Sequence, residues 1–405
     1  MYLSTRRFGR ESASGQEHRP MKSLVVGLLL VLSLPSFAQT AGDSVADFGF
    51  DYFSRVAKDG NTVVSPLSIH ACFAMLTLGT AGPTEAESLK VLRLKPGFEQ
   101  GYRHLLQGLR FAPDPQSGEG GQISLASRLW PSRKLKLKAR FLELCKATFG
   151  AAPESLDFGN TKAARRRINE WVSQETQKLI PELLPPGALD SSTDLVLSNA
   201  LYFKAQWESA FDPAHTRPGP FHTPSGDLEV PMMHGQLDGL FYQTSEMTSV
   251  SLAYKGGPFA MLFVAPKSSL AECRTKLSKN LLSEVEKSAM GGGGRISVTV
   301  PKFTISQESD PLPTLRAMGM VDLLGAGPDF SRLAENSRGL SVDKCFHQAV
   351  VEVDESGTKA AAATAVVMVR SPMPTIVLDR PFLFVLYHRS TLAPLFIGQV
   401  VDPTK

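Results

Sequence analysis

ESGTKAAAATAVVMVRSPMP, residues 355–374, fits neither a loop, nor a buried helix, nor a committed strand. A loop should be more polar, a buried helix should carry larger apolar residues, and alanine is depleted in strands. If the stretch were a strand with period two, one face would be uncharged and mostly small: Thr358, Ala360, Ala362, Thr364, Val366 and Met368. Lys359 lies on the other face, and Pro372 and Pro374 end the stretch. The pattern predicts an exposed segment that can later insert as a strand between other strands.

The N-terminal 38 residues have the layout of a secretory signal peptide. After Met21 and Lys22 comes an apolar run over residues 24–34, and a small-x-small site ends at Ala38. Such a run is too short to span a bilayer comfortably. The sequence therefore predicts translation from Met21, cleavage after Ala38 and a secreted protein, extracellular or periplasmic; a buried core segment is the alternative.

Charge gives no reason to expect nucleic-acid binding. Residues 1–38 hold five basic and two acidic residues of the chain's 43 and 39, which leaves the remainder with a net charge near +1. The one basic run, residues 133–140, fits an edge strand or a turn with solvated charges, and polyanion binding is its alternative. The four cysteines, in no C-x-x-C pair, are expected to be free and mostly buried, although an even count permits disulfides.

Helical periodicity dominates the first half of the chain and strand patterns dominate the second, which indicates an α+β fold. Helices are predicted over residues 44–55, from Pro66 onward, and over residues 163–180, where Ile168, Trp171, Val172 and Leu179 share one face. Strands are predicted before Pro66 and over residues 195–203, 296–303, 350–353, 383–387 and 395–401.

The familiar signatures of enzymes are missing from the sequence. It has no G-x-S-x-G elbow, no H-E-x-x-H motif and no Walker-type glycine loop, and no histidine pair has the spacing of metal ligands. The sequence therefore predicts no catalytic residues, no metal and no cofactor, and disfavours a secreted hydrolase.

Several blocks of the sequence, in order, resemble the serpin family. They are residues 61–80, 197–207, 230–233, 300–303, 347–349 and 379–384. The resemblance implies one domain over residues 39–405, with three β-sheets, eight or nine helices and an exposed reactive-centre loop over about residues 355–378.

Site residues follow from the same resemblance. The loop hinge is Glu355, Gly357, Thr358, Ala360, Ala361, Ala362, Ala363 and Thr364, and the polar cluster that controls separation of the main sheet's strands is Ser65, Ser68, Asn199 and His347. Insertion begins near Trp207 and Lys302, and Lys302 is expected to pair with Glu355. Two departures from the family pattern are Lys359, where many inhibitory members are acidic, and Gln177, at a usual glycine position.

The function that the resemblance implies is suicide inhibition of a serine protease, which becomes a covalent acyl-enzyme partner. Neither nucleic acid nor membrane is an expected partner, and the protein is expected to be a monomer that can form loop–sheet polymers. A non-inhibitory serpin, such as a carrier or chaperone, is the alternative. The target protease, the source organism and any polyanion cofactor stay open.

Two bonds compete as the bait that the protease attacks. The family's usual loop length points to Ser371-Pro372, but an X-Pro amide has no N–H and a constrained geometry. Arg370-Ser371 offers a guanidinium for a trypsin-like pocket and a following serine. We favour Arg370-Ser371; cleavage after Val369 or Met368 by an elastase-like protease, or inhibition of a cysteine protease, remains an alternative.

Overall fold

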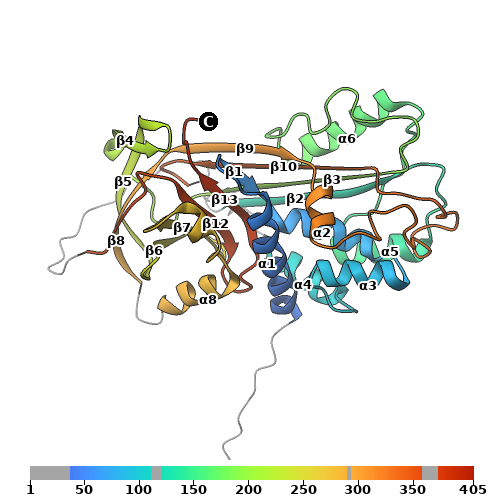
Figure 1. The fold of residues 1–405 in the computed structure, drawn as a ribbon, viewed down its shortest axis with the longest axis horizontal. Helices are drawn as coiled ribbons and strands as arrows, with labels where there is room; N and C mark the ends of the chain where they lie inside the picture. Colours follow the sequence, from blue (N-terminus) through green and yellow to red (C-terminus); the bar gives the residue numbers. More distant parts are fainter. Residues whose placement is uncertain (1–36, 111–120, 290–292, 358–372) are drawn as a thin grey trace, which may run out of the picture. The chain divides into compact units, whose positions relative to one another are not determined.

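Four long strands form the sheet on which the candidate site is built. The computed structural model describes residues 37–110, 121–289, 293–357 and 373–405. The four-stranded sheet has the order β2 (Gly121–Pro131), β3 (Leu195–Ala205), β10 (Lys344–Val353), β9 (Phe303–Ser309), and Figure 1 shows these strands running side by side. β3 is antiparallel to β2 and parallel to β10, whereas β10 is antiparallel to β9.

A second, nine-stranded sheet consists of two parts that share β5 (Gly226–Gln243). Residues 232–239 of β5 pair with β8 (Gly294–Pro301), and residues 240–243 pair with β6 (Met247–Ala253). The other strands are β1 (Thr62–Val64), β4 (Arg217–Thr223), β7 (Phe259–Pro266), β11 (Thr375–Val377), β12 (Phe382–His388) and β13 (Pro394–Val400). The three sheets implied by the resemblance are thus present, with two of them joined through β5.

Nine α-helices and one 3-10 helix occur in the described part of the chain, and the predicted α+β class is confirmed. They are α1 (Phe37–Val56), α2 (Pro66–Thr77), α3 (Gly82–Val91), α4 (Glu99–Gly108), α5 (Ala139–Phe149), α6 (Thr161–Glu175), η1 (Pro213–His215), α7 (Leu270–Arg274), α8 (Lys279–Ser288) and α9 (Leu312–Ala317).

Helices cover both faces of the four-stranded sheet. α2 and α6 both contact β2 and β3, and they approach from opposite sides in Figure 1. Alternate residues of β3 therefore enter different cores: Leu195 and Leu197 pack in the cluster that contains α2, whereas Val196 and Ala200 pack in the cluster that contains α6. This double coverage explains why the strand predicted over residues 195–203 is apolar on both faces, apart from Ser198 and Asn199.

Two predicted helices have the wrong limits. α1 begins at Phe37, seven residues before the predicted start at Ser44, because residues 37–43 contain no proline and Ala41 is already buried. α6 ends at Glu175 rather than at residue 180, because Gln177 and Lys178 adopt positive φ angles of 50° and 65°. Leu179 consequently leaves the predicted buried face and is 40% exposed.

Among the strands, β10 starts at Lys344, six residues before the predicted start, and the predicted strand over residues 296–303 is split by Lys302 into β8 and β9. The basic run over residues 133–140 is a turn that leads into α5, and its five cations are exposed. All four cysteines are free and buried, as predicted.

Candidate functional site

The main feature of the candidate site is an opening between the two central strands of the four-stranded sheet. β3 and β10 pair from Val196 and Lys344 to Leu201 and Ala349, where their register ends in the described structure. Both strands nevertheless continue, β3 to Ala205 and β10 to Val353. Because β10 stays paired with β9 as far as Val353, the two halves of the sheet diverge at this end.

A tight turn of residues 354–357 lies at the opening, directly after β10. The Trp207 N–H donates to the Ser356 carbonyl at 2.9 Å, and the Phe211 N–H donates to the Glu355 carbonyl at 2.9 Å. The Trp207 indole N–H also donates to the Asp354 carbonyl at 3.1 Å. The segment that follows β3 therefore holds the first residues of the predicted loop hinge.

Gly357 reverses the chain at this turn. Its φ of +131° is rarely adopted by residues with side chains, and an added Cβ would lie 2.4 Å from the Ala205 carbonyl oxygen and 2.7 Å from the Trp207 nitrogen. Only glycine fits here without displacing backbone. A strand that continued from Gly357 would run antiparallel to β10 and, because β3 is parallel to β10, antiparallel to β3 as well.

The predicted ion pair between Lys302 and Glu355 is present, with 2.7 Å between Nζ and Oε2. Lys302 lies in the break between β8 and β9, and the Thr216 hydroxyl donates to the other oxygen of Glu355 at 2.8 Å. Burial raises the pKa of the Glu355 carboxyl, but the hydrogen bonds from Lys302 and Thr216 outweigh it, so this pKa lies below its ordinary value. The carboxylate is therefore charged and held in place.

The four residues of the predicted polar cluster meet beneath the paired end of the opening. Asn199 and His347 are cross-strand neighbours on β3 and β10, and Ser65 and Ser68 come from the N-terminus of α2. The Ser65 N–H donates to His347 Nε2 at 3.2 Å, which places the imidazole proton on Nδ1, 2.5 Å from Asn199 Oδ1. The Ser68 hydroxyl lies 3.1 Å from the Ser65 carbonyl oxygen and 3.3 Å from Asn199 Oδ1.

This cluster is buried and uncharged. All four side chains are at most 1% exposed, and burial lowers the pKa of His347 to about 3. A neutral imidazole that accepts from α2 and donates to β3 links both strands to the helix. The cluster is therefore a polar joint between β3, β10 and α2, at the end of the sheet where the strands are still paired.

Three residues that contact the polar cluster or Glu355 were not predicted from the sequence. Ser127 of β2 donates to the Ser68 carbonyl at 3.3 Å, the Asn199 amide contacts Cys345 Sγ at 3.5 Å, and Thr216 binds Glu355. The signal that could have indicated Ser127 is a polar residue on the strand face that Ile123, Leu125 and Leu129 make apolar, since buried polar groups need partners. Cys345 and Thr216 carry no such signal.

Much of the predicted loop lies outside the described residues, including the hinge residues from Thr358 to Thr364 and both residues of the Arg370-Ser371 bond. The description resumes at Met373, and β11 then pairs in parallel with β8.

In the described part of the chain, no group of histidine, cysteine or acidic residues could hold a metal ion. No described helix combines the length and apolar character needed to cross a membrane.

Comparisons with known proteins agree with this architecture. The model of the family described as serpin (serine protease inhibitor) matches residues 43–403. An uncharacterised serpin-like protein of Thermococcus kodakarensis is 33% identical over 375 residues, which cover 89% of this chain and 85% of the relative. Alpha-1-antitrypsin 1-3 of Mus musculus is 32% identical and covered to 89% on both sides.

Two solved structures are similar over nearly the whole chain. Human thyroxine-binding globulin complexed with thyroxine has a TM-score of 0.81 at 30% identity, with 91% of this chain and 100% of that one covered. Native protease nexin-1 with heparin has a TM-score of 0.80 at 27% identity, with 90% and 100% covered. With the open four-stranded sheet, the buried polar joint and the match over residues 43–403, this chain belongs to the serpin family.

Proposed function

We propose that this serpin is a suicide inhibitor of serine proteases that traps its target by inserting the reactive loop into the four-stranded sheet. The observation that carries the proposal is the opening between β3 and β10, with the turn at residues 354–357 directly above it. The unpaired ends of two mutually parallel strands offer hydrogen-bonding edges to one antiparallel strand between them. Gly357 itself already forms an antiparallel bridge with Gln206, in the direction that such a strand requires.

The composition of the following residues supports insertion. The face of the segment that would turn inward carries no charge between Thr358 and Met368, and Ala360 to Ala363 are small. A charged residue on that face would cost several kcal/mol on burial. Only an inhibitor has to bury this face by insertion, so a non-inhibitory serpin would tolerate such residues but an inhibitor would not. Lys359 lies on the opposite face and does not interfere.

In the proposed reaction the protease's serine hydroxyl attacks the carbonyl carbon of Arg370. The amide bond to Ser371 breaks, the new amino group of Ser371 leaves with the proton, and Arg370 remains attached to the protease as an ester. The released hinge then inserts between β3 and β10 and carries the protease with it. Inhibition requires insertion to be faster than hydrolysis of the ester, so the native fold must hold the loop out in a kinetically trapped state.

The bait residue sets the class of target. An arginine side chain can pair bidentately with a carboxylate at the base of a specificity pocket, which favours trypsin-like proteases. The sequence before Ala38 supports secretion of the domain over residues 39–405, as a monomer that meets extracellular or periplasmic proteases. Loop–sheet polymers are expected when the sheet opens without a protease, because the opening can accept the loop of another copy of the chain.

The test is a gel assay with trypsin. We expect a complex that resists SDS, and mass spectrometry should find a released C-terminal peptide that begins at Ser371. Arg370→Ala should abolish the complex, whereas Ser371→Ala and the exposed control Arg338→Ala should leave it largely intact. Cleavage without a stable complex would indicate a non-inhibitory serpin, and a peptide with another first residue would overturn the assigned bond.

A further inference from the structure

A pocket of about 400 Å³, called the α7 pocket below, lies beside α7, and none of its lining residues belongs to the four-stranded sheet. Its walls come from the residues after α1, the turn between β4 and β5, the end of β7 with α7, the residues before β12 and the residue after β13. The apolar part of the lining is Pro224, Pro266, Leu270, Ala271, Pro381 and Val401. Only Val401 among these is buried, so the pocket leaves apolar side chains partly open to solvent.

A guanidinium group in this lining is held by neutral groups. Arg274, the last residue of α7, donates through Nη1 to the Lys58 carbonyl at 3.0 Å and to Gln399 Oε1 at 3.1 Å. Gln399 is fully buried, and its amide nitrogen donates to the Lys58 and Gly60 carbonyls, each at 2.6 Å. The position of the guanidinium is therefore set by a buried network of neutral groups and not by an acidic partner.

One edge of this guanidinium is unused. Among the residues that the structure describes, Nε and Nη2 of Arg274 make no hydrogen bond and the side chain forms no ion pair. These two nitrogens carry parallel N–H groups that match the two oxygens of a carboxylate. Of the other charged lining residues, Arg380 pairs with Asp379, Lys58 has no ion pair in the described ranges, and Asp59 is acidic. The lining therefore carries a net positive charge.

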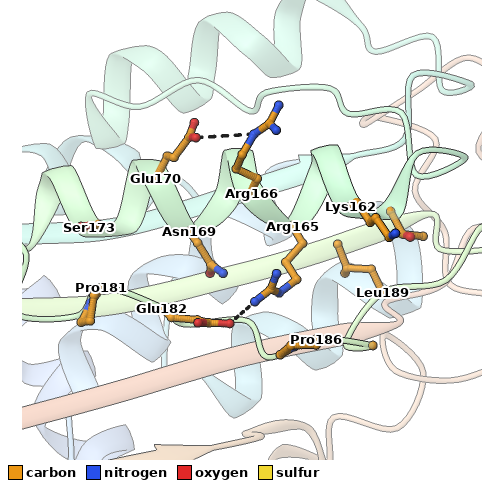
Figure 2. A pocket seen from close by; sticks show the side chains of 12 residues that line it. Lys162, Arg165, Arg166, Asn169, Glu170, Ser173, Pro181, Glu182, Pro186 and Leu189 are labelled. Carbon is orange, nitrogen blue, oxygen red and sulfur yellow. Dashed lines mark hydrogen bonds and ion pairs between the residues drawn. The ribbon is translucent and has the colours of Figure 1, made fainter.

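The larger pocket beside α6 has the opposite arrangement. Its volume is about 650 Å³, and Figure 2 shows Arg165 directed at Glu182 and Arg166 directed at Glu170, each in an ion pair. Each of these arginines already has a carboxylate partner from the protein itself. The α7 pocket differs because the carboxylate that would complete its guanidinium is not supplied by the described part of the chain.

We propose that the α7 pocket binds a small aromatic carboxylate. The carboxylate accepts from Nε and Nη2 of Arg274, and Lys58 and Arg380 add positive charge around it. Three of the lining residues are prolines, and proline rings pack well against aromatic faces, as they do when aromatic-lined grooves bind proline-rich peptides. Ligand pockets usually measure about 300–1,000 Å³, so this volume suits a ligand with one or two fused rings. The proposal does not rest on inhibitory activity.

Titration calorimetry of the full-length protein with 1-naphthaleneacetate tests the proposal, and 1-naphthaleneacetamide is the uncharged probe with the same rings. We expect one site that binds the acid about tenfold more tightly than the amide, or better, because the amide cannot form a charge-assisted bidentate pair. Octanoate, a carboxylate with a flexible chain, should bind more weakly than 1-naphthaleneacetate. Equal binding of the acid and the amide, no binding of the acid, or tighter binding of octanoate would overturn the proposal.

Substitutions at Arg274 and Ala271 locate the site. Arg274→Gln removes both donors and should weaken binding of the acid about tenfold or more, whereas Arg274→Lys keeps the charge without the fork and should weaken it about threefold. Ala271→Phe, at an exposed position of the lining, should fill the pocket and block binding while the free protein keeps its thermal midpoint. This variant separates ligand binding from any role of Arg274 in folding.

The matched control lies at the other pocket. Lys162→Gln removes an exposed cation from the lining of the pocket beside α6 and should bind 1-naphthaleneacetate like wild type. If Arg274→Gln and Ala271→Phe both keep wild-type affinity, the ligand binds elsewhere and the assignment to the α7 pocket is wrong.

Discussion

Lowering the pH from about 7.5 to about 4.5 should weaken the native fold through His347. Burial lowers the pKa of this imidazole to about 3, whereas an unfolded histidine titrates near its ordinary value of about 6.5. The unfolded chain therefore binds a proton before the native protein does. The stabilisation is complete above about pH 6.5, declines as the pH falls, and is fully lost near pH 3.

The size of the effect follows from this pKa difference. Each pH unit below about 6.5 costs about 1.4 kcal/mol per histidine, so His347 alone costs about 3 kcal/mol at pH 4.5. His70 and His388 are also buried, and burial lowers the pKa of each to about 4. Together the three histidines should cost about 8 kcal/mol, which is comparable to the whole stability of an ordinary domain.

Urea unfolding followed by tryptophan fluorescence over this pH range measures the loss. His347→Gln should remove about one third of the pH dependence that the three buried histidines give to the unfolding free energy, because one of these three is removed. The exposed, non-titrating residue Gln107 provides the control for mutation itself, and Gln107→Ala should keep the wild-type slope. A wild-type slope in His347→Gln would refute the assignment.

A second readout concerns the role of His347 as a joint. Because it links α2 and β3 to β10, His347→Ala should let the strands part and reduce the monomer content after mild heating at neutral pH. Size-exclusion chromatography measures that content. An unchanged monomer fraction would show that the cluster does not control opening of the sheet.

Gly357→Ala should destabilise the native state by about 2–3 kcal/mol, since its Cβ would overlap the Ala205 carbonyl at a positive φ. The control Gly60→Ala places its Cβ in open space and should change the urea midpoint little. If both variants unfold at the same urea concentration, the predicted clash at Gly357 is wrong. Lys302→Ala should speed polymerisation, because it leaves the largely buried Glu355 carboxylate with only Thr216 as a side-chain partner; wild-type polymerisation kinetics would count against this. Burial raises the pKa of all four cysteines, so a thiol reagent should modify fewer than one per native molecule and all four after unfolding.

Local signals predicted those elements whose causes lie close together in the chain. Pro66 indicated the start of α2, and the structure has Pro66 as the first helical residue, with Ser65 as its N-cap. The mostly apolar residues 195–203 indicated a buried strand, which the structure has as β3. The family blocks then predicted that Ser65, Ser68, Asn199 and His347 would act together, although local sequence alone cannot bring together residues so far apart.

Tertiary contacts decided the features that depend on distant neighbours. β10 begins at Lys344, earlier than its pattern suggests, because β3 and β9 supply hydrogen-bonding edges that sustain a strand with alternating polar residues. The break at Lys302 arises where one strand leaves the nine-stranded sheet and the next joins the four-stranded one. α6 ends early because Gln177 and Lys178 take left-handed conformations that no pattern of apolar residues reveals.

The composition of the loop was therefore readable from the sequence alone: small, uncharged on one face and ended by prolines. Where that loop could go was not. The divergence of β3 and β10 past Leu201 and Ala349, and the anchoring of Glu355 by Lys302 and Thr216, exist only when segments that lie 53 to 148 residues apart in the chain are folded together. Side-chain pattern is a property of neighbouring residues, whereas an unpaired strand edge is a property of the assembled sheet.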